Sequence, residues 1–210
     1  MLYLLYKEGY YMKFYYASKT DRVFAVYEKD SKYYPVFVEK YGTDEFIPTE
    51  SLEEITNEEE VAALKKYLHP YEEGKTKIYI AGPLFNEGDR YTNQVNSDKL
   101  RELGYTTFLP QEIVITNKST ELVKAGCFFM DLVAIKNCDC LVVNCNGIDI
   151  DSGTAAEIGL GYGLNKKLIL YKSDVRNYYN DMYRLNNFVG GLVDNKVCRT
   201  INEVIDELKK

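Results

Sequence analysis

The chain has 210 residues, 26 of them basic and 32 acidic, with a formal net charge of −6. This length suits one domain of ordinary size with a small appended unit. Nucleic-acid binding needs a basic face that neutralises phosphates, and no such concentration of charge is present, so small molecules are the expected ligands.

The amino end begins with an apolar run, residues 1–6, which meets Lys7 and Glu8 well short of the ~20 residues of a membrane span. We therefore predict a cytoplasmic protein that does not contact membranes. From residue 13 to about 38, β-type stretches alternate with turn-type residues, which predicts a meander of antiparallel hairpins.

A helix should follow this β unit. Thr56 or Asn57 can cap it, acidic residues fill its first turn, and it should run to about Leu68. Residues 1–75 are thus expected to form a small β-hairpin-rich domain of unknown role, and residues 76–210 a separate domain.

The second domain alternates strands with helices, which implies a parallel sheet of about five strands with right-handed crossovers. We predict an α/β fold of the flavodoxin-like or Rossmann-like type. The expected strands are residues 78–81, 106–109, 139–143, 167–171 and 196–198, and the expected helices are residues 91–103, 120–137, 155–164 and 201–208.

The cysteines are predicted to be buried free thiols. They are odd in number and no export signal is present, which argues against a disulfide framework. Zinc binding is the alternative, but the spacing is not Cys-x-x-Cys and the single histidine, His69, is remote in sequence. We therefore expect no metal. The cysteines are Cys127, Cys138, Cys140, Cys145 and Cys198.

The organising stretch is residues 151–159, which follows the strand 139–143 and leads into the next helix. Open α/β sheets bind ligands at the carboxyl ends of their strands. Glu157 has two interpretations here. With Thr154 it fits a capping box, in which both side chains satisfy amide groups at the helix start. Alternatively, the positive potential of the helix terminus keeps Glu157 ionised as a nucleophile.

Three glycines, Gly159, Gly161 and Gly163, superficially resemble a dinucleotide fingerprint. They lie within a helix rather than at a strand-to-helix turn, and Leu164 replaces the third glycine, so we reject NAD binding. Glycines cost an exposed helix roughly 1 kcal/mol each, so we expect close approach to the sheet or to a ligand.

Other carboxyl groups could join Glu157. Asp149 and Asp151 lie just upstream on the connecting loop. Cleavage of a glycosidic bond needs one carboxyl group to attack the anomeric carbon and another to manage the leaving-group proton. Asp131 stands among apolar residues of a predicted helix, where it either bonds to a helix end or contacts a ligand.

Tyr79 ends in a phenol on the first strand of this domain, and it is either one more packed tyrosine or a partner for these carboxylates. It precedes Ala81-Gly82-Pro83-Leu84-Phe85, whose small and rigid residues suit a loop over a substrate.

Three stretches together resemble the nucleoside 2-deoxyribosyltransferase family. They are residues 77–85 (Lys-Ile-Tyr-Ile-Ala-Gly-Pro-Leu-Phe), Asp131 with Asn137-Cys138-Asp139, and Asp151-x-Gly153-Thr154-Ala155-x-Glu157-x-Gly159. The resemblance covers about residues 76–210, where residues 173–177 are also similar, and the amino-terminal unit lies outside it.

The resemblance implies that Glu157 is the nucleophile and forms a covalent deoxyribosyl intermediate. It also implies that Tyr79 positions that carboxylate, and that Asp131 and Asp151 contact the base and assist its protonation. The resemblance also implies substrate contacts from six residues, the last of them in a carboxyl-terminal loop: Ala81, Gly82, Pro83, Phe85, Gly153 and Asn187.

Such enzymes exchange bases in two displacement steps, with retention at the sugar and without a metal or cofactor. Family members assemble as oligomers in which a loop asparagine reaches the neighbouring site, so a homo-oligomer is expected. The implied substrates are a nucleoside and a free nucleobase.

Two alternatives remain open. The first is a hydrolase of 2'-deoxynucleoside 5'-monophosphates, in which water replaces the acceptor base; residues 81–85 lack the serine and arginine of the hydrolases' phosphate-binding loop, which favours the transferase. The second is a non-catalytic nucleoside-binding module whose amino-terminal domain contacts a protein partner.

Overall fold

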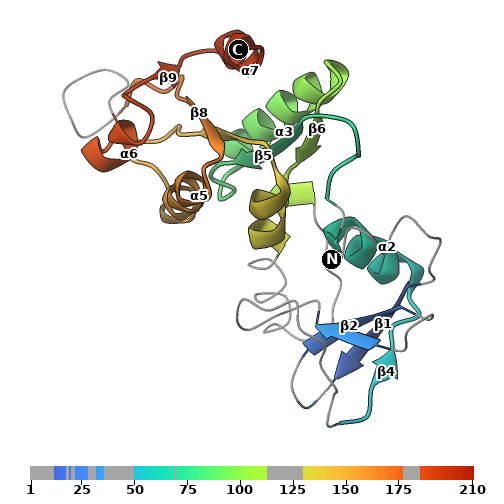
Figure 1. Ribbon diagram of the computed structural model, residues 1–210. Helices are drawn as coiled ribbons and strands as arrows, with labels where there is room; N and C mark the ends of the chain where they lie inside the picture. The colour runs from blue at the N-terminus through green and yellow to red at the C-terminus, as the bar shows by residue number, and fades with distance from the viewer. Residues whose placement is uncertain are drawn as a thin grey trace. The chain divides into compact units, whose positions relative to one another are not determined.

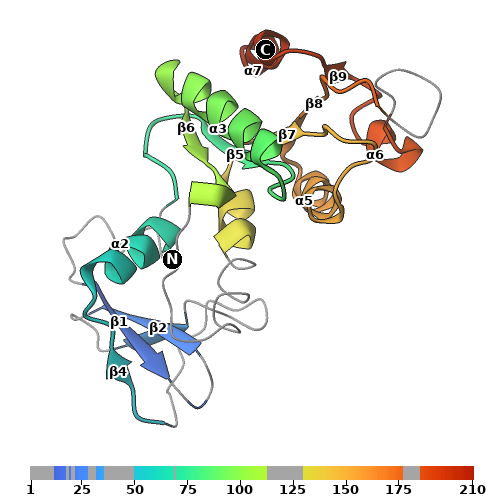
Figure 2. The same ribbon diagram turned by 180° about the vertical axis from the view of Figure 1, so that it is seen from behind.

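The computed structural model describes residues 12–17, 19, 22–27, 32–35, 50–68, 70–112, 130–176 and 185–210. Figures 1 and 2 show it from opposite sides. The chain separates into two compact units. The first comprises Met1–His69 and Val114–Asp131, and the second comprises Pro70–Ile113 and Leu132–Lys210.

The first unit contains an antiparallel sheet in the order β3-β2-β1-β4. The predicted meander is confirmed for its first three strands, whereas β4 was not predicted. Helix α2 (Glu58–Leu68) follows, and the Oδ1 atom of Asn57 accepts from the amides of Glu59 and Glu60 at 3.0 Å each. Asn57 is therefore the cap. The strands are β1 (Met12–Ala17), β2 (Arg22–Tyr27), β3 (Lys32–Pro35) and β4 (Glu53–Glu54).

The second unit is built on a five-stranded parallel sheet in the order β6-β5-β7-β8-β9. This confirms the predicted flavodoxin-like arrangement. Because the chain passes from β5 outward to β6 and then returns to β7 on the other side, the strand order reverses between β5 and β7. Ligands of open α/β sheets bind at such a switch point. The strands are β5 (Lys77–Ala81), β6 (Thr106–Phe108), β7 (Cys140–Asn144), β8 (Lys167–Tyr171) and β9 (Val197–Cys198).

The helices of this unit are α3 (Glu87–Glu102), α5 (Ser152–Gly163), α6 (Asn187–Gly191) and α7 (Ile201–Leu208). Helix α3 starts four residues earlier than predicted, because Asn86 caps it by accepting from the Asp89 amide at 2.9 Å. The short α6 was not predicted. Residues 130–137 are helical, in agreement with the predicted helix 120–137, whose earlier part and Cys127 lie outside the described residues.

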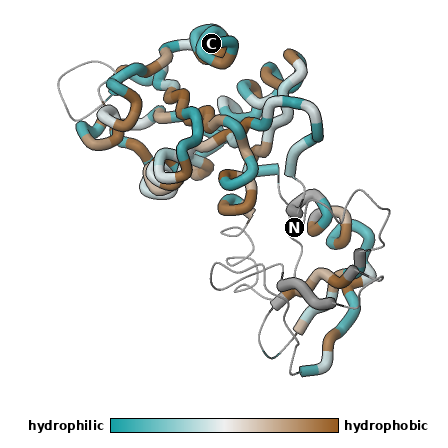
Figure 3. The backbone as a smooth tube through the Cα atoms, viewed as in Figure 1, coloured by the Kyte–Doolittle hydropathy of each residue, from teal (hydrophilic) through white to brown (hydrophobic). Residues whose placement is uncertain are grey.

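Helices cover both faces of this sheet. Leu100 of α3 and Val204 and Ile205 of α7 pack in one hydrophobic core with β5, β7 and β8. Helix α7 buries the apolar Val204 and Ile205, whereas the buried face of α3 is mostly polar, with Asn93, Asn96 and Ser97 beside Leu100. Figure 3 colours the backbone by hydropathy. Helix α5 lies on the opposite face. Since strand side chains alternate between faces, Tyr79 points away from that core, toward α5.

Gly161 allows α5 to approach the sheet closely. A Cβ atom there would lie 3.0 Å from both Cδ atoms of Leu141 on β7 and 3.1 Å from Cδ2 of Leu168 on β8. The predicted close approach is thus confirmed at Gly161. At Gly159 and Gly163 a Cβ atom would meet nothing within 4 Å, so packing against the sheet does not explain these two glycines.

Candidate functional site

The central contact of the site joins Tyr79 on β5 to Glu157 on α5. The Tyr79 hydroxyl donates to Oε1 of Glu157 at 2.5 Å. The Tyr79 side chain is fully buried and its ring stacks on Phe108 of β6, with centroids 5.6 Å apart and an interplanar angle of 16°. Packing therefore fixes the phenol, and the phenol in turn orients one oxygen of the half-buried Glu157.

The capping-box interpretation of Glu157 is wrong. Helix α5 begins at Ser152, and its cap is Asp151, whose Oδ2 atom accepts from the Thr154 amide at 3.1 Å and from the Thr154 hydroxyl at 3.4 Å. Thr154 is thus the third residue of the helix, and Glu157 lies in the second turn, where backbone amides bond within the helix. Its carboxylate points to Tyr79 instead of to the helix start.

The loop after β5, residues 82–85, is held by two side chains of α3. The Asn93 side chain on α3 donates to the Pro83 carbonyl at 3.0 Å, and Arg90 donates to the Leu84 carbonyl at 2.8 Å. At the end of β7 the Asn144 side chain donates to Oδ1 of Asn93 at 2.8 Å. Asn93 and Asn144 are buried, so this network fixes the loop at the switch point between β5 and β7.

Asn93 and Asn144 were not among the predicted site residues. The sequence does carry a local signal at Asn144. This residue ends the apolar run Leu141-Val142-Val143 and places a polar side chain at the carboxyl end of a buried strand. A buried amide needs hydrogen-bond partners, so such a residue predicts a polar partner from another element. Asn93 offered no comparable signal within its polar helix.

Gly82 should not tolerate a side chain. A Cβ atom there would lie 2.8 Å from Cβ of Asn144, and 3.0 and 3.2 Å from the amide atoms of Asn93. We expect Gly82→Ala to lower the free energy of unfolding by about 1–3 kcal/mol through overpacking, and to lower activity by displacing the loop. Gly163→Ala is the control: with open space around it, it should be neutral or stabilise by up to about 1 kcal/mol. Urea denaturation measures both, and equal stability of the two variants would contradict the prediction.

The remaining predicted residues are distributed as follows. Ala81 is buried as the last residue of β5, and Pro83 is also buried. The Phe85 side chain is 81% exposed. Gly153 is exposed in the first turn of α5, where a Cβ atom would lie 3.1 Å from Oδ2 of Asp151. Asn187 is exposed as the first residue of α6.

Asp131 is the predicted site residue that falls in the other compact unit. It is half-buried in the helical residues 130–137 and is the last residue assigned to the first unit, whereas Tyr79, Asp151 and Glu157 belong to the second. Its role as a site residue stays a prediction.

The four cysteines among the described residues, Cys138, Cys140, Cys145 and Cys198, are buried free thiols, as predicted. Burial raises the pKa of Cys138 to about 11 and those of Cys140 and Cys145 to about 12. Such thiols are inert at neutral pH. Within the described ranges no group of three or more His, Cys, Asp or Glu side chains could hold a metal ion.

No helix in the described parts of the chain is both long and apolar enough to cross a membrane.

Comparison with known proteins places the second unit in a family. The sequence model of the family described as nucleoside 2-deoxyribosyltransferase matches residues 78–203, more than half of the chain. Among solved structures, a conserved protein from Enterococcus faecalis V583 is 26% identical with a TM-score of 0.54, over 65% of this chain and 98% of that chain. A 2-deoxyribosyltransferase from Bacillus psychrosaccharolyticus is 29% identical with a TM-score of 0.50, over 61% of this chain and 90% of that chain.

The comparison with curated proteins found no match. The family match supports an enzyme that acts on nucleosides. The chain belongs to the nucleoside 2-deoxyribosyltransferase family.

Proposed function

We propose that this protein is a nucleoside 2-deoxyribosyltransferase that moves the 2'-deoxyribosyl group of a nucleoside to a free nucleobase through a covalent intermediate on Glu157. The hydrogen bond from Tyr79 to Glu157 is the observation that carries the proposal. It orients a carboxylate at the carboxyl edge of the sheet, beside the switch point at which open α/β sheets bind ligands. A buried phenol fixed by stacking is a preorganised donor for this purpose.

The proposed reaction has two displacement steps. In the first, a carboxylate oxygen of Glu157 forms a bond to C1' of the sugar while the N-glycosidic bond breaks, and the base leaves with the bonding electrons and takes up a proton. In the second, a ring nitrogen of the acceptor base attacks C1' from the opposite side, loses a proton, and releases the Glu157 carboxylate. Two inversions give net retention at C1'.

Proton transfer to the leaving base is assigned to carboxyl groups other than Glu157. Asp151 lies six residues before Glu157, and its Oδ2 atom is engaged with Thr154 as the helix cap. The base contact is therefore assigned to the other carboxylate oxygen of Asp151, Oδ1. Asp131 remains a proposed base contact on the strength of the family resemblance alone. A homo-oligomer in which Asn187 reaches a neighbouring site is proposed on the same ground.

The electrostatics of α3 support an uncharged sugar over a 5'-phosphate. This helix follows the substrate loop directly, and helix amino termini ordinarily attract anions. Here the first turn carries Glu87 and Asp89, and the Asn86 side chain hydrogen-bonds to the Asp89 carboxylate. Arg90 lies in the same turn, so two carboxylates against one guanidinium leave this terminus with a net negative charge, which opposes a phosphate and favours nucleosides over nucleoside monophosphates.

The test is a product analysis. The protein is incubated with deoxyinosine or deoxyadenosine, with and without a second free base, and the products are separated by chromatography. A new nucleoside that forms only with the acceptor base supports transfer. Release of free deoxyribose, whether or not the acceptor base is present, would instead indicate a hydrolase. Parallel incubations with the corresponding 5'-monophosphates test the phosphate argument. No turnover of nucleosides or monophosphates would overturn an enzymatic function.

A further inference from the structure

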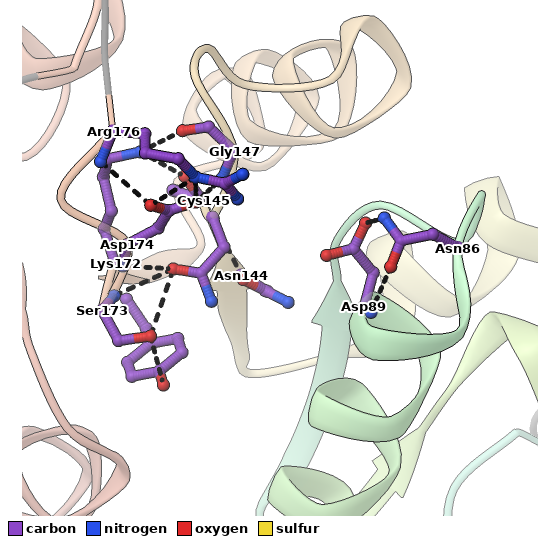
Figure 4. A network of polar contacts seen from close by, with 11 residues as sticks. Asn86, Asp89, Asn144, Cys145, Gly147, Lys172, Ser173, Asp174 and Arg176 are labelled. Carbon is purple, nitrogen blue, oxygen red and sulfur yellow. Dashed lines mark hydrogen bonds and ion pairs between the residues drawn. The ribbon is translucent and has the colours of Figure 1, made fainter.

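The loops after β7 and β8 are joined by a buried cation. The Lys172 side chain follows β8, the residue is 1% exposed, and its Nζ atom donates to the carbonyls of Cys145 at 3.2 Å and Gly147 at 2.6 Å. Figure 4 shows this cluster at the carboxyl edge of the sheet. Because a buried ammonium group is costly unless its protons are bonded, the two carbonyls must be turned toward it in the native fold.

Other side chains strengthen the same connection. The Oδ1 atom of Asn146, in the loop after β7, accepts from the backbone amides of Ser173 and Asp174 at 2.9 Å each. In the opposite direction, Oδ2 of Asp174 accepts from the Gly147 amide at 3.2 Å. Arg176 binds the Asp174 carboxylate through Nε at 3.0 Å and through a guanidinium nitrogen at 2.6 Å, which fixes the acceptor.

Gly147 is the point at which these contacts converge. Its φ is 117°, a backbone conformation that side-chain-bearing residues rarely adopt. Its carbonyl is bound by Lys172 and its amide by Asp174. The loop after β8 therefore imposes the turn at Gly147, and that turn directs residues 148–151 toward the start of α5.

The geometry points to Lys172 as a positioning residue for the reaction: its buried side chain fixes residues 145–151 and thereby the placement of Asp151, α5 and Glu157 relative to Tyr79. This inference rests on the proposed function, since it concerns the same nucleophile. Lys172 itself contacts carbonyls in the described structure and is not assigned a chemical step.

The charges around Lys172 affect whether its side chain stays protonated. Desolvation lowers the pKa of this ammonium group, and the nearby carboxylates of Asp174 and Asp149 act in the opposite direction. Arg176, the other cation in reach, lowers it further. Carboxylates from both loops thus help to keep the amine charged, and a neutral replacement should loosen both.

The test compares Lys172→Met with a matched control at the opposite edge of the sheet. Lys166 also donates from Nζ to two carbonyls, those of Lys136 and Cys138, at 2.7 Å each. Lys166→Met therefore removes the same kind of contact before β8 instead of after it. We expect kcat for base exchange to fall about 10–100-fold in Lys172→Met, the range that a small misplacement of reacting groups produces, and to stay within about threefold in Lys166→Met.

Hydrogen exchange supplies a readout that does not depend on turnover. Amides of residues 145–157 should exchange at least about tenfold faster in Lys172→Met than in the unmodified protein, and Lys166→Met should leave this segment unchanged. Unchanged exchange there in Lys172→Met, or a kcat equal to that of Lys166→Met, would overturn the positioning role. If the unmodified protein transfers no sugar between bases, the proposed function fails. The hydrogen-exchange rates of residues 145–157 still decide whether Lys172 fixes this segment.

A second variant covers the case in which Lys172→Met does not fold. Asn146→Ala removes the acceptor of two backbone amides in the loop after β8, and its side chain is only half-buried. It should accelerate exchange of residues 145–157 and lower kcat in the same direction by a smaller factor. Protection equal to that of the unmodified protein would count against the connection between the two loops.

Discussion

Glu157→Gln should abolish base exchange while the protein remains folded. The amide has the shape of the carboxylate and can still accept a hydrogen bond from Tyr79, but it cannot attack C1' as an anionic nucleophile. Removal of the nucleophile from a catalytic unit lowers kcat by roughly 10⁴-fold or more. Steady-state kinetics with a nucleoside and an acceptor base measure this loss. Mass spectrometry of the unmodified protein with a nucleoside alone should detect the deoxyribosyl adduct, and the adduct should be absent in the variant.

A comparison with Asp151 separates catalysis from helix capping. Asp151 caps α5, so Asp151→Ala should lower the free energy of unfolding by about 0.5–2 kcal/mol. Glu157→Gln removes no cap and should change it by less than about 0.5 kcal/mol. Urea denaturation of the two variants tests this difference. Wild-type turnover in Glu157→Gln would contradict the assignment of Glu157 as the nucleophile. A loss in the free energy of unfolding equal to that of Asp151→Ala would indicate a structural role for Glu157 instead.

The misassigned cap shows where local sequence patterns reach their limit. Asp151-x-x-Thr154 and Thr154-x-x-Glu157 both have the spacing of a cap and its third helical residue. The choice between them depends on where α5 starts, and Gly153 is compatible with either start. In the structure the helix includes Ser152, which selects Asp151 as the cap. The catalytic interpretation of Glu157 gained support from tertiary structure that the motif does not encode.

Strands were more predictable than helix starts because their apolar runs are buried. The runs at β5, β7 and β8 lie within one residue of their predicted bounds, since each is enclosed by helices. The start of α3 was missed because residues 87–90 are polar and the deciding feature is the Asn86 side chain. Helix α6 was missed because its five residues are too few to show a helical repeat of apolar residues.

The contact between Tyr79 and Glu157 could be predicted only from the family resemblance. Tyr79 and Glu157 are 78 residues apart, and their meeting requires that β5 lie next to β7 and that α5 cover the face to which Tyr79 points. The strand alternation predicts a parallel sheet but not its strand order. Asn93 and Asn144 illustrate the same limit, because their contact joins a helix and a strand that no local pattern relates.

Tyr79→Phe should lower kcat about 10²-fold, the usual effect of removing one preorganised donor from a reacting group. Phenylalanine keeps the ring and its stacking on Phe108, so the core is preserved and only the hydroxyl that orients Glu157 is lost. Because Glu157 is half-buried, water can hydrate the exposed oxygen, but water does not fix its orientation. The measurement is kcat and KM for base exchange, with the loss expected in kcat.

Tyr71→Phe provides the matched control. Tyr71 is buried, packs against the same Phe108 ring with centroids 6.4 Å apart, and donates its hydroxyl to the Ala134 carbonyl at 3.0 Å. Both variants lose one tyrosine hydrogen bond, so both should lower the free energy of unfolding by about 1 kcal/mol. Only Tyr79→Phe should lose activity, because only its hydroxyl orients Glu157. Equal kcat losses in the two variants would mean that Phe108 packing, rather than the Tyr79 hydroxyl, supports the site.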